Sequence, residues 1–145
     1  MEENKKEKAI IVSGYFNPLH KGHIEYFQRS KELGNKLFVI VNNDNQRSLK
    51  GSKEFMLEDE RMLIIESLSI TDLTVLSIDQ DKTVCKTLEF LHNKYNEKYE
   101  LYFANGGDQL IDNIPELKIC QSLSINLIDG LGKKIQSSSW LLDKE

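Results

Sequence analysis

The chain has 145 residues, with 19 Lys plus Arg against 23 Asp plus Glu and a formal net charge of −4 at pH 7. This length encloses a single hydrophobic core, and the acidic balance excludes general electrostatic attraction to nucleic acid. No apolar run approaches the roughly 20 residues that cross a bilayer. We therefore expect a charged tail at 1–8 and one domain at 9–145, in a cytoplasmic protein without a nucleic-acid or membrane partner.

The first predicted element is a buried strand at Lys8–Ser13, because its centre, AIIV, is apolar and rich in branched side chains. Gly22–Leu33 follows with apolar residues at helical spacing and predicts a helix. Gly34 comes directly after it, and we expect this glycine to end the helix by taking a positive φ.

A second buried strand is predicted at Leu37–Val41 and a second helix at Leu57–Leu68. The segment between them, Asn42–Phe55, has no periodic pattern and is predicted to be a loop. The remaining elements are a strand at Leu73–Ile78, a helix at Thr83–Tyr95, and strands at Leu101–Ala104 and Ile125–Ile128. Alternating strands and helices require crossover connections. The chain is therefore predicted to form an α/β fold, a single Rossmann-like domain with a mostly parallel sheet and helices on both faces.

The sequence predicts no metal centre at its two cysteines or at His92. Cys85 and Cys120 lie far apart, with no cluster of His or Cys at the spacing of metal ligands. We expect two thiols in the core, and we expect His92 to lie on a solvated helix face.

The main candidate site is the connection between the first strand and the first helix, which reads GYFNPLHKGH. His20 and His23 are three residues apart at the opening turn of a helix, where free N–H groups and the positive end of the helix dipole attract anions. Gly22 leaves room for a phosphate, and Gly14 allows a sharp exit from the strand. Since ligands bind at the carboxyl edge of open α/β sheets, this pattern predicts a phosphate site. The alternative is that both histidines are ordinary surface residues.

This string resembles the G-x-F-[DN]-x-x-H-x-G-H signature of the cytidylyltransferase-like nucleotidyltransferases. These include glycerol-phosphate cytidylyltransferases, heptose-phosphate adenylyltransferases and nicotinate-nucleotide adenylyltransferases. SLKG at 48–51 and EDERM at 58–62 resemble the L-K-G and E-x-R-M stretches of the heptose-phosphate enzymes. ANGGD at 104–108 resembles their GGD motif, and QSSS at 136–139 resembles the I-S-[ST]-[ST] motif. The resemblance runs from about Ile10 to Leu142.

The resemblance implies transfer of a nucleoside monophosphate from CTP or ATP to a phosphorylated small molecule, such as a sugar or alcohol phosphate, with release of pyrophosphate. His20, His23 and Lys50 would be catalytic, and Arg61 would help hold the triphosphate or its pocket. The other binding residues would be Gly14, Tyr15, Phe16, Gly22, Asn105, Gly106, Gly107, Asp108, Lys133, Gln136, Ser137, Ser138 and Ser139. Mg²⁺ would be bound with the triphosphate rather than in a protein cage, and the enzyme would be a homodimer.

Two positions depart from the family pattern. Asn17 stands where many members have Asp, and Gly132 stands where an arginine often precedes the last motif, so that Lys133 or Lys134 would supply the charge. The choice between CTP and ATP therefore stays open. A nicotinate-nucleotide or flavin adenylyltransferase, favoured by Asn17-Pro18, is one alternative. A non-catalytic nucleotide-binding module is another, and an assay of pyrophosphate release distinguishes it.

Overall fold

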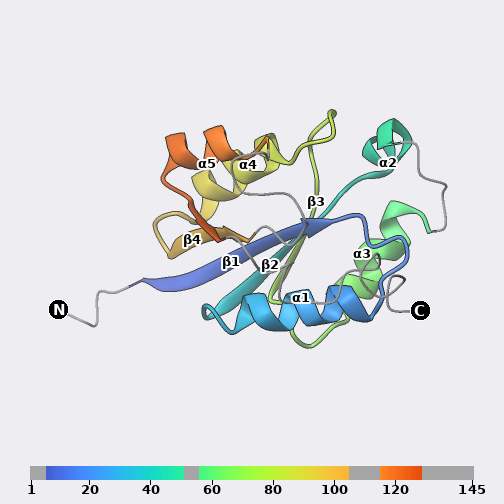
Figure 1. The fold of residues 1–145 in the computed structure, drawn as a ribbon, viewed down its shortest axis with the longest axis horizontal. Coiled ribbons are helices and arrows are strands. Elements are labelled where there is room, and N and C mark those ends of the chain that lie inside the picture. Colours follow the sequence, from blue (N-terminus) through green and yellow to red (C-terminus); the bar gives the residue numbers. More distant parts are fainter. Residues whose placement is uncertain (1–5, 51–55, 105–114, 129–145) are drawn as a thin grey trace, which may run out of the picture.

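The computed structural model describes residues 6–50, 56–104 and 115–128 (Figure 1). Strands and helices alternate along these ranges, except that two helices lie between the second and third strands, and the helix before the last strand was not predicted. The strands are β1 (Glu7–Gly14), β2 (Lys36–Val41), β3 (Leu73–Leu76), β4 (Tyr99–Ala104) and β5 (Asn126–Ile128). The helices are α1 (Lys21–Lys31), α2 (Asp44–Lys50), α3 (Glu58–Glu66), α4 (Cys85–Tyr95) and α5 (Leu117–Leu123).

The strands form one parallel sheet in the order β3-β2-β1-β4-β5. Ile11 at its centre pairs with Phe38 of β2 on one side and Phe103 of β4 on the other. The chain moves outward from β1 through β2 to β3 and then returns to the opposite side of β1 to form β4. Since open α/β sheets bind ligands where the strand order reverses, the carboxyl ends of β1 and β4 mark the expected site.

Helices cover both faces of the sheet, which confirms the predicted fold class. On one face α4 and α5 pack over a core that includes Ile11 and Leu88. On the other, α1 and α3 pack over Val12, Phe27 and Ile65, and Figure 1 shows these two helix layers on opposite sides of the sheet. Successive strand residues point to opposite faces. With both faces buried, the central strands read as continuous apolar runs rather than alternating ones.

The first strand is longer than predicted. It begins at Glu7, inside the segment 1–8 that we expected to be a tail, and Glu7 and Lys8 pair with Tyr99 and Glu100 of β4. The partner strand lies about ninety residues away along the chain, at Tyr99. Charged residues at a strand end carry no apolar signal, so only this long-range pairing shows that they belong to the sheet.

Helix α2 lies in the segment that we predicted to be a loop, and for these residues the prediction was wrong. The Asn43 side-chain oxygen accepts the N–H of Gln46 at 2.8 Å, which is the geometry of a helix N-cap. Gln46 is buried, and its side-chain amide donates to the carbonyl oxygens of Asp81 and Thr83. A helix of this length depends on tertiary contacts rather than on propensity, so it leaves no periodic pattern in the sequence.

The expected role of Gly34 was also wrong. Helix α1 ends at Lys31 with Glu32 as a right-handed C-cap, and Gly34 takes no positive φ. A Cβ at Gly34 would lie 2.9 Å from the carbonyl oxygen of Lys8. Glycine is needed here because the connection from α1 to β2 passes directly against the backbone of β1.

Both cysteines are free thiols. Cys120, in α5, is buried in the core, and burial raises the pKa of its thiol to about 12. Cys85, the first residue of α4, is half-buried, with its sulfur 3.8 Å from the carbonyl oxygen of Pro115. The core prediction is therefore right for Cys120 and wrong for Cys85, which lies at a helix end. No helix within the described ranges is long and apolar enough to cross a membrane.

Candidate functional site

The connection between β1 and α1, residues 15–20, is here called the histidine loop. Phe16 has a φ of 53°, an uncommon conformation for a residue other than glycine, and the Asn17-Pro18 peptide bond is cis. The Phe16 side chain is buried, and its ring meets His23 and Phe27 edge to face at centroid distances of 5.0 and 5.4 Å. The buried Phe16 ring therefore anchors the histidine loop to the core and also contacts His23.

The absence of a side chain at Gly14 makes room for the Phe16 ring, and it is not needed for the predicted sharp exit of the chain from β1. The φ of Gly14 is not positive, so the sharp exit from the strand does not depend on glycine's conformational freedom. A Cβ at Gly14 would lie 2.8 Å from the Phe16 ring. The missing side chain leaves the space that the ring occupies.

His20 and His23 contact one another at the start of α1. His20 is the N-cap, and its Nδ1 accepts the N–H of Gly22 at 3.1 Å. The Nδ1 of His23 accepts the N–H of His20 at 3.1 Å, and the two rings stack with centroids 3.9 Å apart. The pair thus satisfies backbone donors of the first helical turn and fixes both imidazoles at the end of the sheet predicted to bind a ligand.

These hydrogen bonds decide which ring nitrogens carry protons. A neutral imidazole has one acceptor and one donor nitrogen, and in both rings Nδ1 accepts a backbone N–H. The hydrogen bonds therefore assign the proton to Nε2 in His20 and in His23. Burial, and then the charge of His20 nearby, lower the pKa of His23 to about 4. At neutral pH the site offers His23 as a neutral donor at the positive end of a helix with no acidic residue in its first turn.

Arg61, in α3, lies beneath the histidine loop, and its side chain is fully buried. Its guanidinium donates to the carbonyl oxygens of Tyr15, Asn42 and Met56. It also forms an ion pair with Asp44 at 2.7 Å. The sequence left two roles open for Arg61, to hold the triphosphate or to hold its pocket. These contacts fit the second role, because they join the histidine loop to the end of β2 and to the starts of α2 and α3.

Two acidic residues join α2 to α3. Asp44 is the first residue of α2 and Glu58 the first residue of α3. Glu58 Oε1 accepts the Asp44 N–H at 2.8 Å, and Asp44 Oδ2 accepts the Glu58 N–H at 3.1 Å. Each carboxylate therefore caps the other helix and lies near its positive end.

The histidine loop makes further contacts with this part of the fold. The Oδ1 of Asn17 accepts the N–H of Met56 at 2.8 Å, just before α3. The Tyr15 hydroxyl lies 3.5 Å from the carbonyl oxygen of Gln46 in α2, and burial raises the pKa of Tyr15 against the opposing effect of Arg61. Asn17 thus holds the histidine loop through its side-chain oxygen. Asp, which many family members have at this position, carries the same kind of acceptor.

The predicted site residues fall into two groups. The structure brings together Gly14, Tyr15, Phe16, His20, Gly22, His23 and Arg61 around the carboxyl end of β1. Lys50 is the last residue of α2, but its side chain lies outside the described part. Asn105, Gly106, Gly107, Asp108, Lys133, Gln136, Ser137, Ser138 and Ser139 also lie outside the described residues.

Sequence reasoning missed Asp44 and Gln46, and it noted Glu58 only as part of a motif, although all three shape this end of the fold. A signal was present, because Asn43 precedes Asp44 in the order typical of an N-cap and a first acidic helical residue. The apolar spacing that would have drawn attention to it was absent. The reciprocal caps connect residues fourteen positions apart, which no local pattern reveals.

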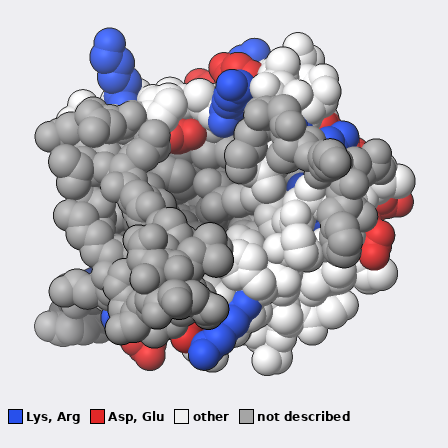
Figure 2. Space-filling model, turned by 45° about the vertical axis from the view of Figure 1, so that its right-hand side comes forward, with Lys and Arg blue, Asp and Glu red and all other residues white. Residues whose placement is uncertain are grey.

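On the side of the molecule drawn in Figure 2, the visible Lys and Arg side chains form no single patch. Figure 2 turns the right-hand side of Figure 1 forward, and the Lys and Arg side chains visible there stand singly. Among the described residues, no group of three or more His, Cys, Asp or Glu is placed to hold a metal ion.

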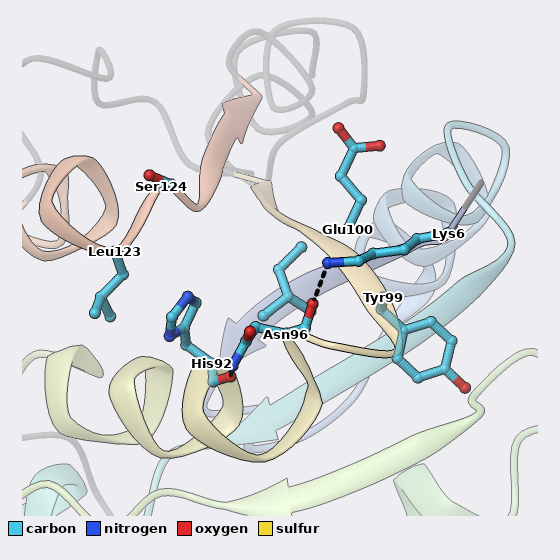
Figure 3. A pocket seen from close by; sticks show the side chains of 8 residues that line it. Lys6, His92, Asn96, Tyr99, Glu100, Leu123 and Ser124 are labelled. Atoms are coloured by element: carbon cyan, nitrogen blue, oxygen red, sulfur yellow. Dashed lines mark hydrogen bonds between the residues drawn. The ribbon is translucent and has the colours of Figure 1, made fainter. Parts of the chain in front are cut away.

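A separate pocket of about 390 Å³ lies at the opposite, amino edge of the sheet (Figure 3). It is lined by Lys6, His92, Asn96, Tyr99, Glu100, Leu101, Leu123 and Ser124, and Lys6 Nζ donates to the Asn96 carbonyl oxygen at 2.7 Å.

The expectation of a solvated His92 was wrong, since its Nδ1 is buried and has no hydrogen-bond partner within the described residues. The helix face that bears it is partly covered because α5 packs beside α4.

Comparisons with known proteins identify a family, related sequences and a shared fold. The sequence profile of the cytidylyltransferase-like family matches residues 11–129. The "Bifunctional protein HldE" of Citrifermentans bemidjiense is 31% identical over 150 residues, covering 99% of this chain and 28% of that protein. The protein of the same name from Blochmanniella floridana is 34% identical over 110 residues, covering 74% of this chain and 21% of that protein.

This chain thus spans about a quarter of the length of these two relatives. Among solved structures, a lipopolysaccharide core biosynthesis protein from Thermoplasma volcanium aligns with a TM-score of 0.68 at 23% identity. The alignment covers 85% of this chain and 95% of the other. This likeness shows a shared fold.

Proposed function

This chain belongs to the cytidylyltransferase-like family and is a nucleotidyltransferase, and on that premise we propose its reaction. It transfers a nucleoside monophosphate from CTP or ATP to a phosphorylated small molecule and releases pyrophosphate. The observation that carries the proposal is that Nδ1 accepts a backbone N–H in both His20 and His23, so that each ring carries its proton on Nε2. Two imidazole N–H donors at a helix N-terminus suit the oxygens of a reacting phosphate.

The reaction is a single in-line displacement. A phosphate oxygen of the acceptor attacks the α-phosphorus, a new P–O bond forms, and the bond to the bridging oxygen of the β-phosphate breaks as pyrophosphate leaves. The nucleophile is already ionised at neutral pH, so no general base is required. The Nε2–H groups of His20 and His23 donate to oxygens whose negative charge grows in the transition state. Catalysis by the protein is mainly positioning and charge stabilisation.

The remaining charge comes from other groups. Lys50 would add a cation near the α-phosphate or the acceptor phosphate, and Arg61 would keep the loop in shape from beneath. Mg²⁺, when bound with the triphosphate, would neutralise phosphate charge. The Gly106, Gly107 and Asp108 segment and the serines at 137–139 would complete the nucleotide pocket, as the family resemblance implies. The proposal also includes a homodimer and a cytoplasmic location.

The first acceptor to examine is a sugar phosphate, with ATP as donor. The relatives reported above are named HldE bifunctional proteins, and the motifs around Lys50 and Asp108 resemble heptose-phosphate adenylyltransferases. An alcohol phosphate with CTP is the second pair. The two pairs differ in the nucleoside base as well as in the acceptor, so each donor is to be tested with each acceptor.

Pyrophosphate release tests the proposal directly. The purified chain is assayed with CTP or ATP, Mg²⁺ and a panel of sugar and alcohol phosphates, and calorimetry measures the binding of each nucleotide alone. We expect one nucleotide to bind preferentially and to yield pyrophosphate only in the presence of an acceptor. Nucleotide binding without turnover on any acceptor would favour the non-catalytic binding module instead.

A further inference from the structure

Asp44, the first residue of α2, contacts α3 at two points. Its Oδ1 pairs with Nη2 of the buried Arg61 at 2.7 Å, while its Oδ2 accepts the first N–H of α3 from Glu58. Its own N–H donates to Glu58, which completes the reciprocal cap. All these contacts are made within the protein, and the Asp44 side chain is 28% exposed.

Arg61 extends this connection to the histidine loop. The same Nη1 atom donates to the Tyr15 carbonyl oxygen at 2.8 Å and to the Asn42 carbonyl oxygen at 2.7 Å. Asp44 therefore fixes the guanidinium that holds the loop next to the end of β2. Through its backbone, Asp44 also fixes the start of α2, the helix that ends at Lys50.

We propose that Asp44 is a positioning residue that keeps α2, and with it Lys50, in register with the histidine loop. This inference rests on the proposed function, in which Lys50 and the two histidines act on one reacting phosphate. Asp44 acts through Arg61 and Glu58 and needs no contact with substrate. Since displacement of a catalytic group by about 1 Å can lower turnover on the order of a hundredfold, a carboxylate that sets this register affects the rate from a distance.

The arrangement of charges favours this role over a purely local cap. Two helix N-termini, each with a partial positive charge, meet at the two carboxylates, and the Arg61 cation adds a full charge. The carboxylate of Asp44 contacts both the Arg61 cation and the first N–H of α3. Its loss would remove one of the two hydrogen bonds that join the starts of α2 and α3, and would leave Nη2 of Arg61 without its charged partner.

Hydrogen exchange tests the positioning without any assay of activity. Amide exchange is compared between the wild type, Asp44→Ala and Asp72→Ala, which breaks the Lys31–Asp72 ion pair of the same 2.7 Å length at the amino edge of the sheet. We expect Asp44→Ala to speed exchange in α2 and in the histidine loop while α4 stays protected, and Asp72→Ala to leave the loop unchanged. Unchanged exchange of the histidine loop in Asp44→Ala would overturn the proposal. Should Asp44→Ala fail to fold, Asp44→Asn keeps an oxygen for Arg61 and is expected to show the same pattern more weakly.

A double-mutant cycle tests the coupling to Lys50. Asp44→Ala is expected to lower kcat/KM on the order of tenfold in the wild type and less than about threefold in Lys50→Ala, because residues that act as a unit are not additive. Equal losses in both backgrounds would show that Asp44 does not act through Lys50. If the wild type releases no pyrophosphate with any pair of nucleotide and acceptor, the proposed function is contradicted. The hydrogen-exchange experiment would still decide whether Asp44 positions α2 and the histidine loop.

Discussion

The Nδ1 atom of His23 accepts the backbone N–H of His20 at 3.1 Å, with the two imidazoles stacked at 3.9 Å. This contact makes the second histidine a structural support for the first as well as a candidate donor to substrate. Capping and catalysis therefore share the same side chains, and substitutions must be chosen to separate the two.

Asparagine is a good N-cap but lacks the imidazole Nε2–H. His20→Asn is therefore expected to keep most of the stability of α1 while it lowers kcat on the order of a hundredfold, the usual loss for an oxyanion-type donor. His20→Ala should lose a similar factor in kcat and also about 1 kcal/mol of unfolding free energy. Pyrophosphate release and urea denaturation measure the two effects. Near-normal turnover in both variants would remove His20 from the mechanism.

The low pKa of His23 makes stability depend on pH. Because its pKa is about 4 in the fold against an ordinary 6.5, the unfolded chain binds more protons than the folded chain between these values. Stability from this group is complete above pH 6.5 and is lost as the pH falls toward 4. Between about pH 7 and pH 5, the wild type should lose about 1 kcal/mol more than His23→Gln, with allowance for solvent around a partly exposed ring. Urea denaturation at both pH values checks this, and parallel losses would contradict it.

Arg61→Met should be strongly destabilising. It removes the buried cation and leaves the carbonyl oxygens of Tyr15 and Asn42 and the Asp44 carboxylate without this donor. We expect a loss of about 3 kcal/mol in unfolding free energy. Arg29→Met, on the exposed surface of α1, is the control and should change stability by less than about 0.5 kcal/mol. Similar small effects in both variants would show that the contacts of Arg61 are not needed for the fold.

Gly14→Ala should disturb the site through Phe16. The added Cβ would lie 2.8 Å from a ring that is packed between His23 and Phe27. Overpacking of this kind costs about 1–3 kcal/mol, and movement of the ring should also lower kcat. Phe16→Leu provides a smaller partner, so the stability loss from Gly14→Ala should be smaller in that background. Denaturation of the four proteins of this cycle measures the difference, and identical losses would argue against a clash with the ring.

The elements that the sequence predicted correctly share one physical property. β1 and β2 are continuous apolar runs, and α1 and α3 bury apolar residues at helical spacing, so each leaves its own local pattern. Helix α2 was missed because its stability comes from Gln46 and Asn43 reaching across to the β3–α4 connection. Such polar contacts have no periodic signature, and their partners lie more than thirty residues away.

The sequence by itself determined the alternation of strands and helices, and hence the parallel α/β fold, because apolar burial follows local periodicity. It also determined the candidate phosphate site, since His20 and His23 lie on one turn of a helix. Only the tertiary structure decided which ring nitrogens donate, why Gly14 is glycine, and how Arg61 and Asp44 hold the histidine loop. Those features depend on hydrogen bonds and close packing between distant segments, whose geometry exists only after the chain has folded.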